Sequence, residues 1–408
     1  MRVILFDEVR NTLDFFSELL KIEFEKRGDE VFMVHMNHFE ERKAEFIQFL
    51  SIKPDLVICY NNAAFSLEVI PGKSFWDTLG TPVVNILFDH PGAYWNILEK
   101  APEVCIPACV DRNHITFLER FIPNLQPGVF MPHGGLELPG EVIPWAERKT
   151  DVLYVGKPSY KVYEEDFLAE KIMNFLKENM SYTVEAAVEA IINQFSIEEL
   201  NNIFPNIKIC LESLGLYSQG LDACDIEALE RESYIEEALR KYNYLHEYLT
   251  SGHRRMLIKQ LVEAGIDVTV YGNWENEKDL LANPHFHFGG YITPMECVEK
   301  MRDSKIVLNS MPWFKDGNHD RICHGMLQKA VVVTETSKYI EERFTDRKEL
   351  RLFTLEQLEA GDIVPNIVKE VLNDEKKAVE IAENGYACAK AYDTMKSRVD
   401  DLLLDLGF

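Results

Sequence analysis

Short apolar runs alternate with amphipathic stretches along the first 135 residues. MRVILF precedes a predicted helix from about Thr12 to Lys26, and EVFMVHM precedes another from about Glu40 to Leu50, which is followed by PDLVICY. Further apolar runs are TPVVNILF, EVCIPACV and GVFMPHG. Such runs between helices are typical of βαβ units and of a parallel sheet covered on both faces. The pattern predicts a Rossmann-like first domain over residues 1–145.

A second series follows LELPGEVIPWAERKT, whose prolines and charges are typical of a connection between domains. Strands are predicted at 151–156, 266–272, 305–311, 330–336 and 349–353, with helices such as 253–264 and 295–303 between them. We expect a second Rossmann-like domain over 146–394. A last helix is expected over 395–408, for which packing back on the first domain is one arrangement. Two domains also suit a chain of 408 residues, because single cores stop growing at smaller sizes.

The segment from about 160 to 250 carries almost no strand signal. SIEELNNIF and DIEALERESYIEEALRKYNYLHEYL have acidic residues at their starts and apolar residues at three-to-four spacing, which predicts amphipathic helices. We therefore expect a helical insertion in the second domain. A structural role, such as covering a cleft, and a role in recognising an acceptor molecule both remain open.

Charge and apolar content narrow the possible functions. The formal net charge of −25 repels nucleic acid over most of the surface, so any anion site must be a local cationic pocket. No apolar run approaches the roughly 18 residues of a membrane span, and we expect a cytoplasmic protein without an integral membrane segment. The eight cysteines form no Cys-x-x-Cys pair, which indicates reduced, buried thiols. Cys105 and Cys109, at a spacing that a helix could bring together, are weak evidence for a metal, and we expect none.

Polar and cationic residues gather where one predicted strand of the second domain ends. KIVLNSM leads into PWFKDGN, and HDRICHGMLQK continues as a helix. Amide groups and the positive end of a helix bind anions, His319 and Arg321 would add cations, and Gly317 would let a bulky anion approach the backbone. Phosphate is the natural ligand. The alternative is that these side chains only cap and solvate an exposed helix.

Three other predicted strand ends of this domain carry small or polar groups. They are Gly156 with Lys157, Tyr271-Gly272-Asn273-Trp274, and Gly289-Gly290-Tyr291. Ligands of open parallel sheets bind beyond the carboxyl ends of the strands. These loops could therefore hold the base, the ribose and the diphosphate of a nucleotide.

The stretches DVLYVGKP, HRRMLIKQLVEAGIDVTVYGNW and HFHFGGYITPMECVEKMRDSKIVLNSMPWFKDGNHDRICHGMLQKAVVVTETSKYI together resemble the carboxyl half of bacterial GT-B glycosyltransferases, in particular the group related to the spore maturation protein CgeB. FDHPGAYWN and MPHGG in the first domain resemble loops of that group. The resemblance implies two Rossmann-like domains facing across a cleft, an acceptor on the first domain and a nucleotide-sugar donor on the second. It implies no essential metal and no cofactor besides the donor, which would be UDP-linked.

Carried over to single residues, the resemblance places the base against the loop of Tyr291, the diphosphate on residues 317–321 with Arg321, and the ribose near His324. Many relatives have a glutamate at this last position, which would accept two ribose hydrogen bonds, whereas a neutral imidazole accepts one. A changed donor and a lost activity both remain open. The expected donor-binding residues are Gly156, Lys157, Gly272, Asn273, Tyr291, Asn309, Gly317, Asn318, His319 and His324.

Catalysis of this kind would be electrostatic on the donor side, because the leaving diphosphate gains negative charge that the helix amides and Arg321 would stabilise. A general base is needed if the reaction inverts the anomeric centre, and His90 or Asp89 suits it. The alternative is that Asp89 and His90 cap the turn before Pro91. Asn61 and His133, at other strand ends, are expected on the acceptor side.

Other charged pairs have a simpler interpretation. His35 and His38 in VHMNHFEE have metal-like spacing, but a solvated loop after a strand accounts for them. Arg254-Arg255 and Arg347-Lys348 are interpreted as surface charges.

The resulting hypothesis is a glycosyltransferase that moves a hexose or related sugar to a glycan, protein, spore-coat or cell-surface acceptor. A sugar-nucleotide epimerase or hydrolase of the same fold is an alternative, and it would turn over the donor without an acceptor. A binding module with a degenerate donor site is another, and it would have no affinity for nucleotide sugars.

Overall fold

The computed structural model describes residues 1–70, 72–158 and 166–408. Residues 1–158 and 252–408 form one compact unit, and residues 159–251 form another. The expected start of the helical insertion, near residue 160, lies outside the described residues. No helix in the described ranges has an apolar stretch long enough to cross a membrane.

The first sheet has six parallel strands, as the alternating pattern predicted. Their order across the sheet is β2 (Glu30–His35), β1 (Arg2–Asp7), β3 (Leu56–Tyr60), β6 (Val83–Leu87), β7 (Cys105–Cys109) and β8 (Val129–Phe130). The helices between them are α1 (Asn11–Lys26), α2 (Phe39–Phe49), α3 (Phe75–Leu79), α4 (Trp95–Leu98) and α5 (Arg112–Phe121), and β4 (Glu68–Ile70) and β5 (Lys73–Ser74) form a small separate hairpin.

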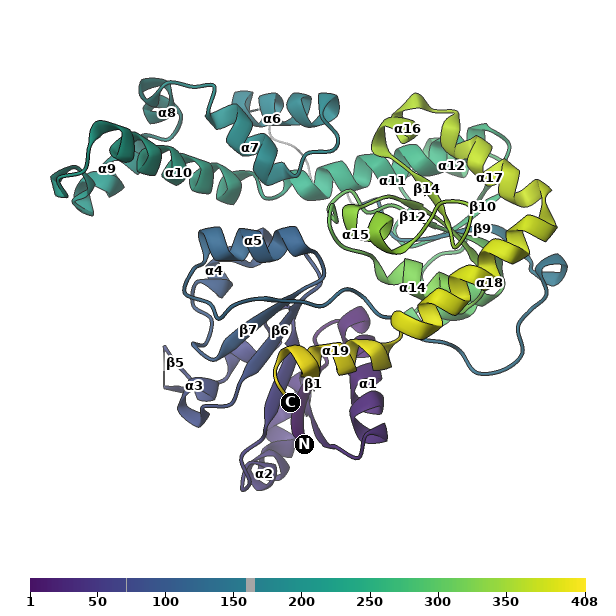
Figure 1. Cartoon of the computed structure of the whole chain (residues 1–408), viewed down its shortest axis with the longest axis horizontal. Coiled ribbons are helices and arrows are strands. Elements are labelled where there is room, and N and C mark those ends of the chain that lie inside the picture. The colour runs from purple at the N-terminus through teal and green to yellow at the C-terminus, as the bar shows by residue number, and fades with distance from the viewer. Residues whose placement is uncertain (71, 159–165) are drawn as a thin grey trace. The chain divides into compact units, whose positions relative to one another are not determined.

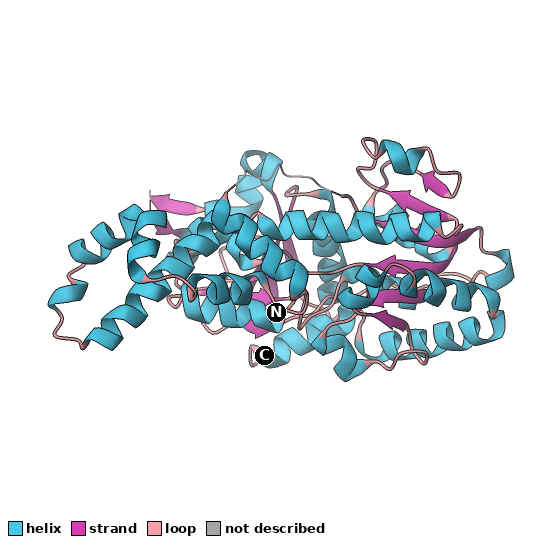
Figure 2. Cartoon of the chain, turned by 90° about the horizontal axis from the view of Figure 1, so that it is seen from above, coloured by secondary structure: helices cyan, strands magenta, loops and turns pink. Residues whose placement is uncertain are grey.

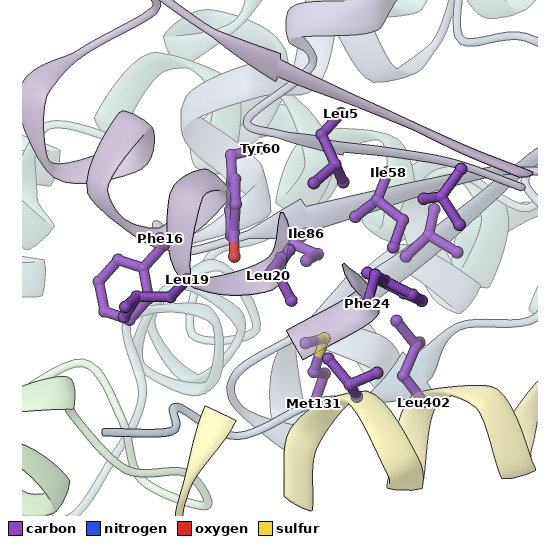
Figure 3. Packing of buried hydrophobic residues seen from close by; sticks show 14 of the residues in the cluster. Leu5, Phe16, Leu19, Leu20, Phe24, Ile58, Tyr60, Ile86, Met131 and Leu402 are labelled. Carbon is purple, nitrogen blue, oxygen red and sulfur yellow. The ribbon is translucent and has the colours of Figure 1, made fainter. Parts of the chain in front are cut away.

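The core of this first domain includes a helix from the far end of the sequence. Phe16, Leu20 and Phe24 of α1, spaced at about one helical turn, pack on strand residues such as Ile58. Leu402 of α19 (Met395–Asp405) lies in the same cluster (Figure 3), and α19 runs beside α1 (Figure 1). Residues near both ends of the printed sequence therefore share one core.

The second sheet also has six parallel strands. Their order is β11 (Phe286–Phe288), β10 (Val268–Tyr271), β9 (Thr150–Val155), β12 (Ser304–Asn309), β13 (Val331–Glu335) and β14 (Arg351–Phe353). The accompanying helices are α12 (Lys278–Leu281), α13 (Pro294–Arg302), α14 (Asp320–Leu327), α15 (Lys338–Arg343), α16 (Leu355–Ala360), α17 (Ile363–Asn373) and α18 (Glu375–Tyr392). The five strands predicted here are confirmed within one to two residues at most ends.

The described part of the other unit, residues 166–251, is built from helices and contains no strand (Figure 2). They are α6 (Phe167–Glu178), α7 (Val184–Ile192), α8 (Ile197–Ile203), α9 (Pro205–Ser213) and α10 (Ala223–Tyr242), followed by the start of α11 (Leu245–Glu263). The helix predicted to begin near His253 is therefore wrong at its start. The helix continues through Ser251 and Gly252, since one glycine inside a helix costs only about 1 kcal/mol.

The cysteines differ from expectation in two ways. Cys105 and Cys109 lie on strand β7 and not on a helix, so four residues separate them by roughly 13 Å and they cannot bind one ion. Cys210 and Cys224 are exposed, whereas buried thiols were expected, and all eight cysteines are free.

Candidate active site

The strand order of the second sheet has a topological switch point, where such sheets bind ligands at their carboxyl edge. β9 is the first strand of the domain, and its neighbours β10 and β12 lead the chain to opposite sides of the sheet. Ligands of doubly wound sheets bind at this switch point. Gly156 follows β9 and the loop of residues 310–319 follows β12, so these two segments lie at the switch point.

The Arg321 guanidinium lies at this switch point. Its Nη1 donates to Asn309 Oδ1 at 2.5 Å, and the Asn309 amide in turn donates to Thr334 Oγ1 at 2.9 Å. The guanidinium carbon lies 5.3 Å from the centre of the Tyr154 ring. A Cβ at Gly156 would lie 3.2 Å from Arg321 Nη2, so a glycine leaves room beside the cation.

Arg254 adds a second cation at the same edge, although the sequence analysis interpreted it as a surface charge. Its Nη1 donates to the Lys157 carbonyl at 3.0 Å, while its buried Nε has no hydrogen-bond partner among the described residues. Burial, and then the charge of Arg321, lowers the pKa of Arg254. Its neighbour Arg255 is instead committed to ion pairs with Glu277, at 2.7 Å, and Asp279.

The glycine loops of this edge pack on one another through their backbones. A Cβ on Gly272 would lie 2.4 Å from the Gly156 carbonyl, and one on Gly289 would lie 2.2 Å from the Tyr271 ring. The Trp274 indole donates to the Gly156 carbonyl at 2.7 Å. Beyond these contacts Lys157, Asn273 and Tyr291 are exposed to solvent, so they are available to a ligand.

The residues before α14 contact the first domain, which the sequence analysis did not foresee. Asn318 Oδ1 accepts the His133 amide at 2.7 Å, and Asn318 Nδ2 donates to the His133 carbonyl at 3.2 Å. Gly317 pairs with Asp111 in an antiparallel bridge, and its Cβ would lie 2.3 Å from the Val110 carbonyl. The space expected to admit an anion at Gly317 is therefore filled by protein.

The histidines here are not the cations that were expected. Burial foremost, aided by the nearby Arg321 charge, lowers the pKa of His319 to about 4, and burial lowers the pKa of His133 to about 3. Burial also lowers the pKa of His324, whose Nδ1 accepts the Leu136 amide at 2.9 Å. The two arginines consequently carry the positive charge at neutral pH.

Two acidic residues at this edge were not singled out from the sequence. Asp320, in the first turn of α14, accepts the Arg321 backbone amide at 2.8 Å and contacts the His319 ring. Glu335 ends β13 and accepts the Met311 amide at 3.1 Å. Burial, opposed by Lys315, raises the pKa of Glu335 to about 7. The only feature of the sequence that could have indicated Glu335 was its position, as an acidic residue at the end of a predicted strand.

At the first sheet, Asn61 and Asp89 lie together but His90 is turned inward. Asp89 is exposed and accepts Asn61 Nδ2 at 3.1 Å and the Tyr94 hydroxyl at 2.6 Å. His90 is buried, and its Nδ1 accepts the Gly92 amide at 3.0 Å. This is the cap before the Pro91 turn that was the alternative interpretation.

Comparisons with known proteins agree with this architecture. Residues 253–404 match the family model of glycosyl transferase-like proteins, whereas no curated protein matches. A glycosyltransferase from Rickettsia africae is similar in structure, with 9% identity, a TM-score of 0.53 and coverage of 98% of this chain and 96% of that one. Sucrose-phosphate synthase from Thermosynechococcus elongatus has 10% identity, a TM-score of 0.52 and coverage of 100% and 99%.

A third similar structure is an alpha-glucosyltransferase in complex with UDP and a 13-mer DNA. It has 10% identity and a TM-score of 0.52 and covers 99% of this chain and 98% of that one. These identities are low, so the structures establish the fold alone, and the family model matches less than half of the chain. The chain therefore has the predicted α/β GT-B fold, within which residues 253–404 are similar to glycosyl transferase-like proteins.

Proposed function

We propose that the protein transfers a sugar from a nucleotide-diphosphate donor to a hydroxyl group, with the donor bound at the carboxyl edge of the second sheet. The donor is UDP-linked and the transfer needs no metal ion. The acceptor is a glycan, a protein or a cell-surface or spore-coat component, and the reaction takes place in the cytoplasm. The match of residues 253–404 to glycosyl transferase-like proteins and the similar structure in complex with UDP support this proposal.

The observation that carries the proposal is the convergence of Arg254 and Arg321. Within the described ranges, neither guanidinium forms an ion pair with a carboxylate. The charge of Asp320 acts on Arg254, and the Asp320 carboxylate accepts the Arg321 backbone amide. Two neighbouring cations repel each other unless an anion joins them, and a diphosphate would do so through charge-assisted hydrogen bonds. As the sugar–phosphate bond breaks, these cations would stabilise the charge that develops on the leaving diphosphate.

Binding of UDP to matched arginine variants tests the donor site. Losing a hydrogen bond to a charged group costs about 1.5–3 kcal/mol, so Arg321→Ala and Arg254→Ala should each weaken UDP binding by about 10- to 100-fold. Arg255→Ala is the matched control, because that guanidinium is already paired with Glu277 and Asp279. Isothermal titration calorimetry supplies the affinities.

Unchanged affinity in both variants would remove the arginines from the donor site. A wild-type protein that binds no UDP, ADP, GDP or TDP would contradict the proposed function and favour a binding module. Turnover of a UDP-sugar to its epimer without an acceptor would favour the epimerase alternative.

A further inference from the structure

Two histidine–carboxylate pairs lie side by side at the carboxyl edge of the first sheet. His38 Nδ1 lies 2.6 Å from Glu8 Oε1, and His35 Nδ1 lies 2.7 Å from Asp7 Oδ1. Glu8 Oε2 also accepts the Asn37 amide at 2.8 Å, so both carboxylate oxygens of Glu8 are fixed. The sequence pattern predicts that these histidines lie in a solvated loop after a strand.

Glu8 is held in an unusual backbone conformation at the switch point of this sheet. Its φ is +58°, and Asn61, which follows β3, has a φ of +44°. β1 and β3 are neighbours from which the chain leads to opposite sides of the sheet, to β2 and to β6. Left-handed conformations in residues other than glycine cost energy and concentrate at functional sites, and the crevice between such strands is where ligands bind.

This edge of the first sheet faces the carboxyl edge of the second. Asp111, just beyond β7, pairs with Gly317, just beyond the β12 loop. Helix α1 follows Glu8 in the sequence. The ring centres of Phe15 and Phe16 on this helix lie 5.9 and 6.0 Å from the ring centre of His324 on α14. A donor held by the second domain would thus be near residues that follow the strands of the first.

The Glu8–His38 pair has the arrangement of a general base. Although desolvation opposes it, the hydrogen bonds from His38 and the Asn37 amide hold the pKa of Glu8 below its usual range. An ionised carboxylate at Nδ1 fixes the tautomer of the ring and leaves Nε2 to accept a proton. The His38 side chain is 55% exposed, whereas His90 is buried with its Nδ1 occupied.

We propose that His38 is the catalytic base that accepts the proton of the acceptor hydroxyl, with Glu8 as its positioning residue; this inference rests on the proposed glycosyl transfer. The His38 Nε2 lone pair takes the proton while the acceptor oxygen bonds to the anomeric carbon. The bond from that carbon to the diphosphate oxygen breaks, and the diphosphate leaves with the electron pair. The proton then passes from the imidazolium to solvent. Attack opposite the leaving group inverts the anomeric centre.

The charges around this base also restrict the acceptor. Asp7, Glu8 and Asp89 lie at this edge, and the charge of Arg10 acts on Tyr94, which donates to Asp89. An anionic acceptor would be repelled by these carboxylates. The acceptor is consequently a neutral or cationic molecule with a hydroxyl group.

The test measures UDP release from UDP-glucose, UDP-galactose and UDP-N-acetylglucosamine, with water or methyl glucoside as acceptor. A positioned base contributes about 10²–10⁴-fold, so His38→Gln should lower kcat/KM by that factor while UDP affinity stays unchanged. His38→Gln should also remove the fall in rate at acidic pH. His35 and Asp7 are the other titratable groups near His38 that could contribute to this fall. Glu8→Gln should lower kcat and leave UDP affinity unchanged, because the ring loses the carboxylate that fixes its tautomer.

His287→Gln is the matched control, because His287 Nε2 lies 2.9 Å from Asp267 in an exposed pair of the same chemistry on the second domain. This variant should keep wild-type rates. Wild-type rates in His38→Gln, or retention of configuration in the released sugar by NMR, would overturn the role of His38 and leave the proposed function standing. No UDP release by the wild type from any of the three donors would overturn both.

Discussion

Asn318 is one of the buried links between the two Rossmann-like domains, and the cost of its removal can be calculated. In Asn318→Ala the His133 amide loses its acceptor at 2.7 Å and stays buried, whereas the His133 carbonyl keeps the Cys323 thiol at 3.2 Å. A buried donor without a partner costs about 1–3 kcal/mol, and the lost second bond about 1 kcal/mol. The variant should therefore lose about 2–4 kcal/mol of the free energy of unfolding.

Urea unfolding followed by tryptophan fluorescence measures this loss, provided that the slope with urea is unchanged. Hydrogen exchange of the His133 amide gives the local readout, and it should accelerate in the variant. Asn283→Ala is the control, because the Asn283 side chain accepts the His285 amide at 2.9 Å in a less buried turn. A loss below about 0.5 kcal/mol, which is typical of ordinary surface substitutions, would refute the reasoning.

Two further substitutions test the same edge. Gly317→Ala would place a Cβ 2.3 Å from the Val110 carbonyl, so thermal unfolding should show a clear loss of stability, and an unchanged Tm would show that the loop moves freely. Burial raises the pKa of Glu335 from its ordinary 4.5 to about 7. The folded state binds more protons than the unfolded state between these values, so this carboxyl group costs stability as the pH rises from about 4.5 to 7. In Glu335→Gln this loss should be absent when the urea midpoints at pH 5 and pH 8 are compared. If the midpoints of the wild type and of the variant change equally with pH, Glu335 does not have the raised pKa.

The strands were predictable because their chemistry is local. Runs such as VILF and VVVT are buried on both faces of a parallel sheet, so they remain apolar without interruption. The prediction of α11 was wrong at its start because Ser251 and Gly252 are poor helix formers, and the rest of a long helix outweighs them. Strand order could not be obtained from periodicity alone, since it depends on how distant elements pack.

The site was predictable only in part, for a different reason. Arg321 and the glycine loops follow strands, and the carboxyl edge of a parallel sheet brings such residues together. The contact of Gly317 and Asn318 with the first domain joins residues almost 200 positions apart, and a single sequence carries no signal for it. Arg254 was misinterpreted because the helical insertion separates it from β9, and the fold restores that proximity.

Helix α19 makes the order of synthesis matter for this protein. Strand β1 and helix α1 leave the ribosome before α19, yet Met395, Val399 and Leu402 of α19 complete the core in which they pack. Until those residues are made, the apolar surface of α1 that they cover stays exposed to solvent and to other chains. The first domain is thus translated first but finished late, and chaperone binding during translation should concentrate on α1.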